Sequence, residues 1–389
     1  MTNIVALAPD QPPKGDLLSP VWPGETIRIT GTEFDELFDW ATAQGASDIR
    51  LQNNLPVWIR IHGRELSVTS RPLLDGEVEE AINRLYGADG QARLRAGEDF
   101  DVSYEFRPDR RRLLRFRVNA TAVRARGHDG GSVTLRALPA TPPPLAELGV
   151  EEPILANFKI RQGFVIVSGG VENGKSTLLA AMTRDILEDP ESHRWILEFA
   201  APIEFVYENI RCVSSGISQS EVPRHLPSFA AGARNAMRRN PKMVIIGECR
   251  DSETMVPACH LAIAGCGVYT TLHAGSMVET IQRAVSFCPV NEREAVAVQL
   301  AQSLRLVVNQ RLVPSVDGKR TALREYLVFD DDLRKKLLRA SPSDWPEIAQ
   351  DALGRHGQSY RIAAQRALAQ GRISEETAYL IKREFGDVD

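Results

Sequence analysis

The sequence is poor in cysteine and has no apolar run long enough to cross a membrane. Its five cysteines form no CxxC pair, which argues against a disulfide framework or a zinc site and favours a reducing compartment. The longest apolar stretch, Leu261–Tyr269, has nine residues, whereas a spanning helix needs about 18 to 20. Met1–Gly15 contains no basic residue before Lys14, which predicts that it is not a secretory signal. We therefore expect a cytoplasmic protein.

Aromatic residues are also scarce, at 6% of the chain, and positive charge is not in excess. The 47 Lys and Arg residues stand against 51 Asp and Glu residues, giving a net charge of −4. This balance disfavours a protein whose main task is to coat nucleic acid. With 43% hydrophobic residues and a length of 389, the chain has the composition of a globular protein of two or three domains.

Apolar patterns divide the chain into five parts. Residues 1–28 are expected to form a flexible tail, and 29–138 a small α/β domain of alternating strands and two helices. The proline-rich stretch within 139–146 predicts a linker, because clustered prolines hold an extended backbone. Short apolar strands alternate with helical patterns over 147–330, which predicts a parallel sheet covered on both faces. Residues 331–389 have a helical, charged pattern.

The strongest chemical signal is the segment GGVENGKST, a match to G-x4-G-K-[ST] that stands between an apolar strand and a helical pattern. Backbone N–H groups of such a loop point at nucleotide phosphates, the lysine reaches the β- and γ-phosphates, and the hydroxyl after it binds Mg²⁺. The alternative is a glycine-rich turn that carries a lysine by chance. The predicted cradle for ATP and Mg²⁺ consists of Gly169, Gly170, Val171, Glu172, Asn173, Gly174, Lys175, Ser176 and Thr177. Ser176 is the predicted metal ligand, and Glu172 places a carboxylate in a loop built for anions.

Two further apolar strands end in polar residues. Glu248 follows the strand that begins at Met243, and the carboxyl edge of a parallel sheet is where ligands bind. This placement predicts that Glu248 orients or deprotonates the water that attacks the γ-phosphate; the alternative is a charged strand end that faces solvent. His273 ends the strand that begins at Gly267. It is either a structural histidine or a sensor of the γ-phosphate or a neighbouring subunit, and the sequence leaves both open.

These segments together resemble a known family. Gly169–Thr177, Val244–Asp251 and Thr270–His273 are similar to the Walker A, Walker B and histidine boxes of the PilT/VirB11-type secretion-ATPase superfamily of pilus-retraction and type IV secretion motors. The likeness covers nearly the whole chain from about Glu33. Within the superfamily, the sequence of Phe199–Glu208 looks closest to the DotB/TraJ type, the ATPases of type IVB secretion and related conjugation systems.

The resemblance implies a fold and an assembly. The fold is α/β, with a PAS-like N-terminal α/β domain, a RecA-like P-loop ATPase domain with a parallel sheet, and a C-terminal helical region. The assembly is a homohexameric ring with ATP between the two domains of each subunit, where hydrolysis moves those domains. Such a ring docks from the cytoplasm on inner-membrane and coupling components of a secretion or pilus machine.

The resemblance also implies roles for arginines. Arg117 and Arg136 lie in segments that match the family's arginine strands, where guanidinium groups meet charge on the γ-phosphoryl group. Arg115 is a further candidate. Arg234 and Arg238 are four residues apart in the predicted helix before Walker B, which places them on one helical face with an intersubunit or γ-phosphate role. For each arginine, the alternative is a solvated surface.

The aspartate box departs from the family pattern. Ala200 and Ala201 stand where an acidic pair is usual, while Glu204 keeps the family's acidic position and Glu198 is displaced by two residues. If the missing acid helps to position magnesium or water, Glu248 carries more of that role here. We therefore expect slow turnover.

Three functions from different classes remain open at this point. The first is a hexameric ATP-hydrolysing motor for type IVB (Dot/Icm-like) secretion or conjugative transfer, with pilus retraction as the alternative within the same family. The second is a RecA-like nucleic-acid translocase, which the acidic balance and the lack of interleaved aromatic and basic residues disfavour. The third is a ring scaffold that binds ATP with little hydrolysis; the altered aspartate box favours it, whereas Glu248 and His273 argue against it.

Overall fold

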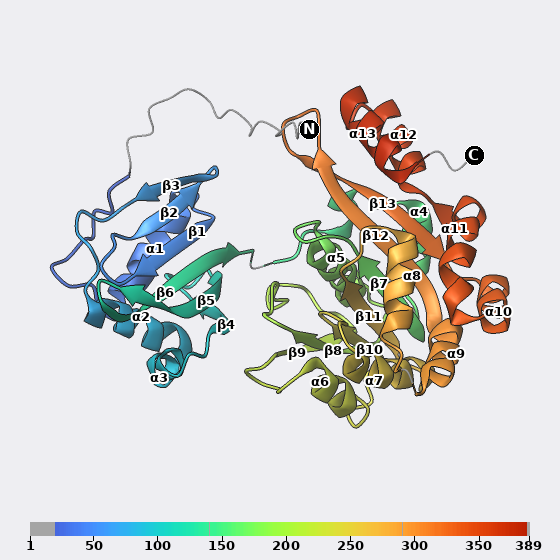
Figure 1. Cartoon of the computed structure of the whole chain (residues 1–389), viewed down its shortest axis with the longest axis horizontal. Helices are drawn as coiled ribbons and strands as arrows, with labels where there is room; N and C mark the ends of the chain where they lie inside the picture. Colours follow the sequence, from blue (N-terminus) through green and yellow to red (C-terminus); the bar gives the residue numbers. More distant parts are fainter. Residues whose placement is uncertain (1–19, 140, 290, 387–389) are drawn as a thin grey trace. The chain divides into compact units, whose positions relative to one another are not determined.

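The computed structural model describes residues 20–139, 141–289 and 291–386. The chain forms two compact units, Met1–Ala140 and Thr141–Asp389, and the division falls inside the proline-rich stretch (Figure 1). Among the described residues, no helix combines the length and apolarity that crossing a bilayer requires.

The first unit is a six-stranded antiparallel sheet packed against helices, with strand order β3-β2-β1-β6-β5-β4. Helix α1 buries Phe34, Leu37, Phe38 and Ala41, the apolar face that its 3–4 residue spacing predicts. Its elements are α1 (Glu33–Ala43), β1 (Asp48–Gln52), β2 (Trp58–Ile61), β3 (Arg64–Ser67), α2 (Asp75–Tyr86), α3 (Gly90–Arg95), β4 (Phe100–Phe106), β5 (Leu114–Ala125) and β6 (His128–Leu138).

The segment expected as a tail, residues 1–28, lies partly outside the described residues. Its described part, from residue 20 on, is attached to the first unit. Trp22 is 3% exposed within the apolar core, and its backbone N–H group donates a hydrogen bond of 2.9 Å to the Val68 carbonyl. Glu25 accepts hydrogen bonds from the backbone N–H groups of Ser70 and Arg71.

The second unit is built on an eight-stranded sheet with the order β14-β13-β12-β7-β11-β10-β8-β9. The strands from β12 to β9 run parallel. At the other end of the sheet, β13 pairs antiparallel with β12, and β14 pairs antiparallel with β13. The elements up to β10 are η1 (Leu145–Leu148), α4 (Glu152–Asn157), β7 (Gly163–Ser168), α5 (Lys175–Glu188), β8 (Trp195–Ala200), β9 (Gly216–Glu221), α6 (Phe229–Ala236) and β10 (Met243–Ile246). Those that follow are α7 (Ser252–Ile263), β11 (Gly267–Leu272), α8 (Met277–Ser286), α9 (Arg293–Ser303), β12 (Leu304–Pro314), β13 (Arg320–Val328), α10 (Asp331–Arg339), η2 (Pro342–Asp344), α11 (Trp345–His356), β14 (Gly357–Gln358), α12 (Tyr360–Ala369) and α13 (Glu375–Phe385).

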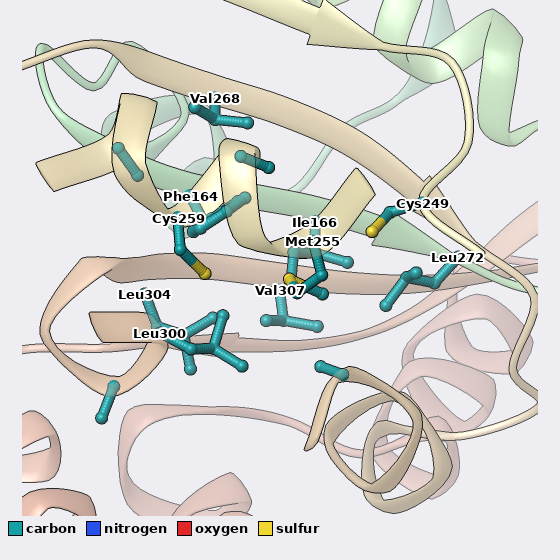
Figure 2. Close-up of a cluster of buried hydrophobic side chains, with 14 of the residues drawn as sticks. Phe164, Ile166, Cys249, Met255, Cys259, Val268, Leu272, Leu300, Leu304 and Val307 are labelled. Atoms are coloured by element: carbon teal, nitrogen blue, oxygen red, sulfur yellow. The ribbon is translucent and has the colours of Figure 1, made fainter. Parts of the chain in front are cut away.

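The central strands are buried on both faces. Every residue of β7 and β11 is buried, as expected for parallel strands covered by helices. On one face Ile166 packs in a cluster with Met255 of α7 and Leu300 of α9 (Figure 2). On the other face Val165 packs with Leu178 of α5. The two layers fix the strands, and therefore the positions at which the strands end.

The fold class predicted from the sequence is confirmed: an α/β first unit, a mainly parallel sheet in the second, and helices α10 to α13 toward the carboxyl end. The C-terminal region also contains the two-residue strand β14, which pairs with β13 and which no periodicity could predict. Ser374 caps α13 by accepting a hydrogen bond from the Thr377 N–H group, as its position before two glutamates predicts.

Candidate nucleotide-binding site

The cradle, residues 169–177, connects the end of β7 to the start of α5. Gly169 has φ 148°, and a Cβ atom there would lie 2.3 Å from the Gln310 carbonyl oxygen. Gly174 has φ 72° immediately before the helix begins at Lys175. Both positions therefore require glycine, and the loop they permit leads into a helix N-terminus, where unpaired N–H groups favour an anion. Ser176 and Thr177 lie half-buried in the first turn of α5.

Two hydrogen bonds attach the cradle to β12, the strand beside β7. The Gln310 side chain donates to the Asn173 carbonyl at 2.8 Å, and the Leu312 N–H group donates to Asn173 Oδ1 at 3.0 Å. The sequence analysis did not identify Gln310. Its only signal there is an amide side chain that, with Asn309, follows the apolar run Leu306–Val308.

The sheet order brings the predicted side chains to one edge, because β7, β11 and β10 are neighbours and their carboxyl ends meet. Lys175 Nζ lies 3.5 Å from His273 Nδ1 and donates to the Gly170 carbonyl at 2.7 Å. His273 Nε2 lies 3.5 Å from Glu248 Oε1. The side chains of His273 and Glu248 are 40% and 33% exposed, so a ligand at this edge can reach them.

The charges of these side chains shift one another's pKa values. Burial lowers the pKa of Lys175, while the charges of Glu248 and Glu204 oppose that shift. The pKa of His273 is also lowered, first by burial and then by the Lys175 charge, against the opposing charge of Glu248. The lowered pKa favours the neutral His273 ring at pH 7, in which one nitrogen donates a hydrogen bond and the other accepts one.

The aspartate box follows β8, the next strand in the sheet. Glu204 lies half-buried there, within the electrostatic range of Lys175. Glu198 is on β8 itself and accepts a hydrogen bond of 2.6 Å from Gln219 of β9. The segment is held by Glu221, the last residue of β9, which is 1% exposed and accepts a hydrogen bond of 3.2 Å from the Ile203 N–H group. Sequence reasoning missed Glu221.

A buried polar cluster holds the histidine loop against the cradle strand. Asn309 of β12 is fully buried and donates to Ser168 Oγ at 2.8 Å and to the Ala274 carbonyl at 2.9 Å. Ser168 directly precedes the cradle, and Ala274 directly follows His273. The Tyr360 hydroxyl of α12 donates to Asn309 Oδ1, so the C-terminal helices are bonded to the same point.

The predicted arginines of the first unit lie on its sheet. Arg117 of β5 and Arg136 of β6 are directly opposite each other across the antiparallel pair. Arg117 Nε donates to Asp101 at 3.1 Å, and Arg136 Nε donates to Asp48 at 3.1 Å. Their side chains are 43% and 53% exposed, whereas that of Arg115 is 1% exposed and ion-paired with Glu105. Burial of Arg115 favours a structural role for it.

The two arginines before Walker B occupy different local structures. Arg234 lies on α6, which ends at Ala236, so that Arg238 belongs to the turn after the helix. Both are exposed and line the same surface pocket, of about 450 Å³, together with Met237.

Comparison with known proteins identifies similar chains. A family model for "Type II/IV secretion system protein" matches residues 35–357. The X-ray structure of the ATPase DotB from Legionella pneumophila has a TM-score of 0.88 and 40% identity, and the match covers 94% of this chain and 99% of that one. The pilus retraction motor PilT with bound ADP has a TM-score of 0.77 and 28% identity over 89% of this chain and 96% of that one. The type IV pilus retraction ATPase PilT of Pseudomonas aeruginosa is 31% identical over 346 residues, which is 89% of this chain and 97% of PilT.

Proposed function

The chain belongs to the family of type II/IV secretion system ATPases, and from this premise we propose that it is a ring-forming motor that hydrolyses ATP to power type IVB-like secretion or conjugative transfer. The observation that carries the choice of system is the likeness to DotB, at 40% identity over 94% of the chain, against 28% for the PilT structure. In this proposal the protein acts as a homohexamer that docks from the cytoplasm on inner-membrane components of the machine.

The cradle is proposed to bind ATP. Its N–H groups face the phosphates at the start of α5, and the Lys175 ammonium neutralises the β- and γ-phosphates. The ADP bound in the PilT structure supports a nucleotide in this family.

The residues present also fit Mg²⁺. In the described part of the chain, no group of three or more His, Cys, Asp and Glu side chains could hold a metal by itself. Mg²⁺ is commonly bound through one or two protein oxygens together with substrate phosphates. The Ser176 hydroxyl, on the first turn of α5, supplies such an oxygen beside the proposed phosphates, with Glu248 and Glu204 at the same edge. The ion would neutralise charge on the phosphates.

Glu248 is the proposed general base. Glu248 follows β10 by two residues, and its carboxylate is partly open to solvent and lies 3.5 Å from His273 Nε2. A water between Glu248 and the γ-phosphate loses its proton to the carboxylate as it attacks. His273 lies between Glu248 and Lys175 and positions the carboxylate, while Glu204 adds negative charge beside the Lys175 ammonium. Arg117 and Arg136 are proposed to stabilise the charge on the γ-phosphoryl group.

Pilus retraction is the second candidate, because the Pseudomonas aeruginosa retraction ATPase matches at 31% identity over 89% of this chain. Strains that carry Lys175→Ala at the chromosomal gene separate the two. Loss of secretion or conjugation with unchanged twitching motility supports the first candidate, and the reverse result supports retraction.

Phosphate release by the purified protein tests hydrolysis. Wild type is expected to release phosphate, and Glu248→Gln is expected to bind nucleotide with wild-type affinity but to lose at least about 100-fold in rate. Lys175→Ala is expected to lose nucleotide binding. A Glu248→Gln protein that turns over as fast as wild type overturns the assignment of the base, and unchanged affinity in Lys175→Ala overturns the cradle.

A further inference from the structure

A buried arginine joins the start of the second unit to the middle of its sheet. We call residues 145–151, which follow the proline-rich stretch, the entry segment. Arg324 of β13 is 2% exposed and donates hydrogen bonds to the carbonyl groups of Leu148 (2.9 Å) and Gly149 (3.0 Å). Its guanidinium also pairs with Glu151 at 3.1 Å. One side chain therefore binds three residues of the entry segment.

The same guanidinium is bonded to the cradle through one intermediate. Arg324 Nε donates to Gln310 Oε1 at 2.8 Å, and Gln310 Nε2 donates to the Asn173 carbonyl at 2.8 Å. Gln310 is 3% exposed. An unbroken path of hydrogen bonds thus runs from the phosphate loop through β12 and β13 to the entry segment, all of it within the second unit.

Each connection in this path is constrained. A buried guanidinium must keep its hydrogen-bond partners, because an unpaired charge is costly away from water. Burial lowers the pKa of Arg324, while the charge of Glu151 opposes that shift. At the other end, the Gly169 backbone packs against the Gln310 carbonyl, where a Cβ atom would lie 2.3 Å from the carbonyl oxygen. A rearrangement of the cradle therefore changes the contacts that Gln310 makes with it.

We propose that Gln310 is a positioning residue of the cradle and that, with Arg324, it transmits the state of the cradle to the entry segment. Nucleotide in the cradle then changes how firmly residues 145–151 are held. The proposal rests on the proposed function only in requiring that the cradle binds nucleotide. The entry segment is where the chain from the first unit enters the second, so this path gives hydrolysis a route to the connection between the units.

The chain offers a matched control. Arg184 of α5 donates to the Pro142 carbonyl at 2.8 Å and pairs with Glu188 at 3.0 Å. It bonds the proline-rich stretch just before the entry segment, but it does so from the C-terminal half of α5. In the described part of the chain it makes no hydrogen bond to Gln310 or to the loop. Arg184→Ala is expected to loosen that stretch equally with and without nucleotide.

Hydrogen exchange of the full-length protein, with and without MgADP, tests the proposal. In the wild type, exchange of the amides in residues 145–151 is expected to slow by about 5-fold or more on ADP binding. Gln310→Glu keeps an acceptor for Arg324 but cannot donate to the Asn173 carbonyl, so it breaks the path at one bond. It is expected to bind ADP and to lose the nucleotide-dependent difference. Gln310→Met, which removes both bonds at nearly constant volume, is a second variant with the same expected result.

The outcomes separate this inference from the proposed function. A wild-type protein that binds ADP without a change at residues 145–151 overturns the inference, as does a wild-type response in both Gln310 variants. A merely structural Gln310 would raise exchange in both states and leave the difference intact. Failure of the wild type to bind ADP contradicts the proposed function instead.

Discussion

At the scale of single residues, Glu172 is unfavourable in its loop both for its backbone conformation and for its charge. It is exposed and has φ 61°, a left-handed conformation that costs a non-glycine residue about 1 to 2 kcal/mol. Glycine avoids that cost but loses about 0.5 to 1 kcal/mol in backbone entropy. We expect Glu172→Gly to raise the free energy of unfolding by about 0 to 1.5 kcal/mol.

The same substitution is expected to strengthen nucleotide binding, because it removes a carboxylate from a loop proposed to hold phosphates. Titration with a fluorescent ADP at low salt is expected to show about 3-fold tighter binding, and the gain is expected to shrink as salt screens the charge. Glu172→Gln is the control: it removes the charge and keeps a non-glycine residue in the left-handed backbone conformation, so it shares the gain in affinity but not the gain in stability. Weaker binding by both variants would mean that the carboxylate assists the ligand.

His273 gives a second prediction at this scale. Burial and the Lys175 charge lower its pKa below the usual 6.5, while Glu248 raises it. The imidazole of the wild type is therefore expected to titrate below pH 6.5 by NMR, and the midpoint is expected to fall further in Glu248→Gln, where the opposing charge is gone. Since the folded pKa is the lower one, His273 removes stability as the pH falls through 6.5. A midpoint above 6.5 in either protein contradicts the cluster.

At the scale of secondary-structure elements, a buried acid on β13 binds the first N–H group of α8. Glu325 of β13 is 5% exposed and accepts a hydrogen bond of 2.5 Å from the N–H group of Met277, the first residue of α8. Burial raises its pKa from 4.5 to about 7, against the hydrogen bonds from the backbone of Met277 and Tyr360. Between these two values the folded protein binds more protons than the unfolded chain, so stability falls as the pH rises through this window.

Replacing this acid is expected to remove that pH dependence. The shift corresponds to about 3 kcal/mol, present in full below pH 4.5 and lost above pH 7. Urea unfolding at pH 5 and pH 8 is therefore expected to show Glu325→Gln gaining stability relative to the wild type at the higher pH. Glu279→Gln, at an exposed glutamate in the first turn of the same helix, is the control and is expected to show no such gain. Parallel behaviour of Glu325→Gln and wild type contradicts the raised pKa.

Elements also show what the sequence could predict. Lys175, Glu248 and His273 each follow a strand of the parallel sheet. They could be brought together from the sequence, because parallel strands present their carboxyl ends at one edge. Gln310 and Arg324 could not be connected in this way. Their partners Asn173 and Leu148 lie 137 and 176 residues away, and a polar residue in a buried strand indicates only that some partner exists. The three-dimensional pairing decides which partner it is.

At the scale of the whole molecule, the question is whether two arginines of the first unit take part in the reaction proposed for the second unit. Arg117 and Arg136 lie opposite each other on β5 and β6, each beside a carboxylate and each about half exposed. Guanidinium groups that meet the charge of a transferring phosphoryl group contribute about 10³- to 10⁵-fold to the rate. If these two do so, Arg117→Ala and Arg136→Ala are each expected to lower phosphate release by at least about 100-fold while ADP affinity stays within about 3-fold.

Unfolding would not explain such a loss in Arg117→Ala. Ion pairs as exposed as Arg117–Asp101 contribute about 1 kcal/mol or less to stability, so the thermal midpoint of this variant is expected to stay close to that of the wild type. Arg136→Ala removes a partner of Asp48, whose side chain is 4% exposed, so this variant is expected to be less stable, and its phosphate release is measured well below its own thermal midpoint. Arg124→Ala is the matched control, because Arg124 is an exposed arginine on the same strand, and it is expected to retain wild-type phosphate release. Arg117→Lys is expected to restore little activity, since an ammonium cannot reproduce the guanidinium fork. Wild-type rates in both alanine variants would show that the first unit does not supply charge to the reaction, and the motor would then need another source of cations for the γ-phosphoryl group.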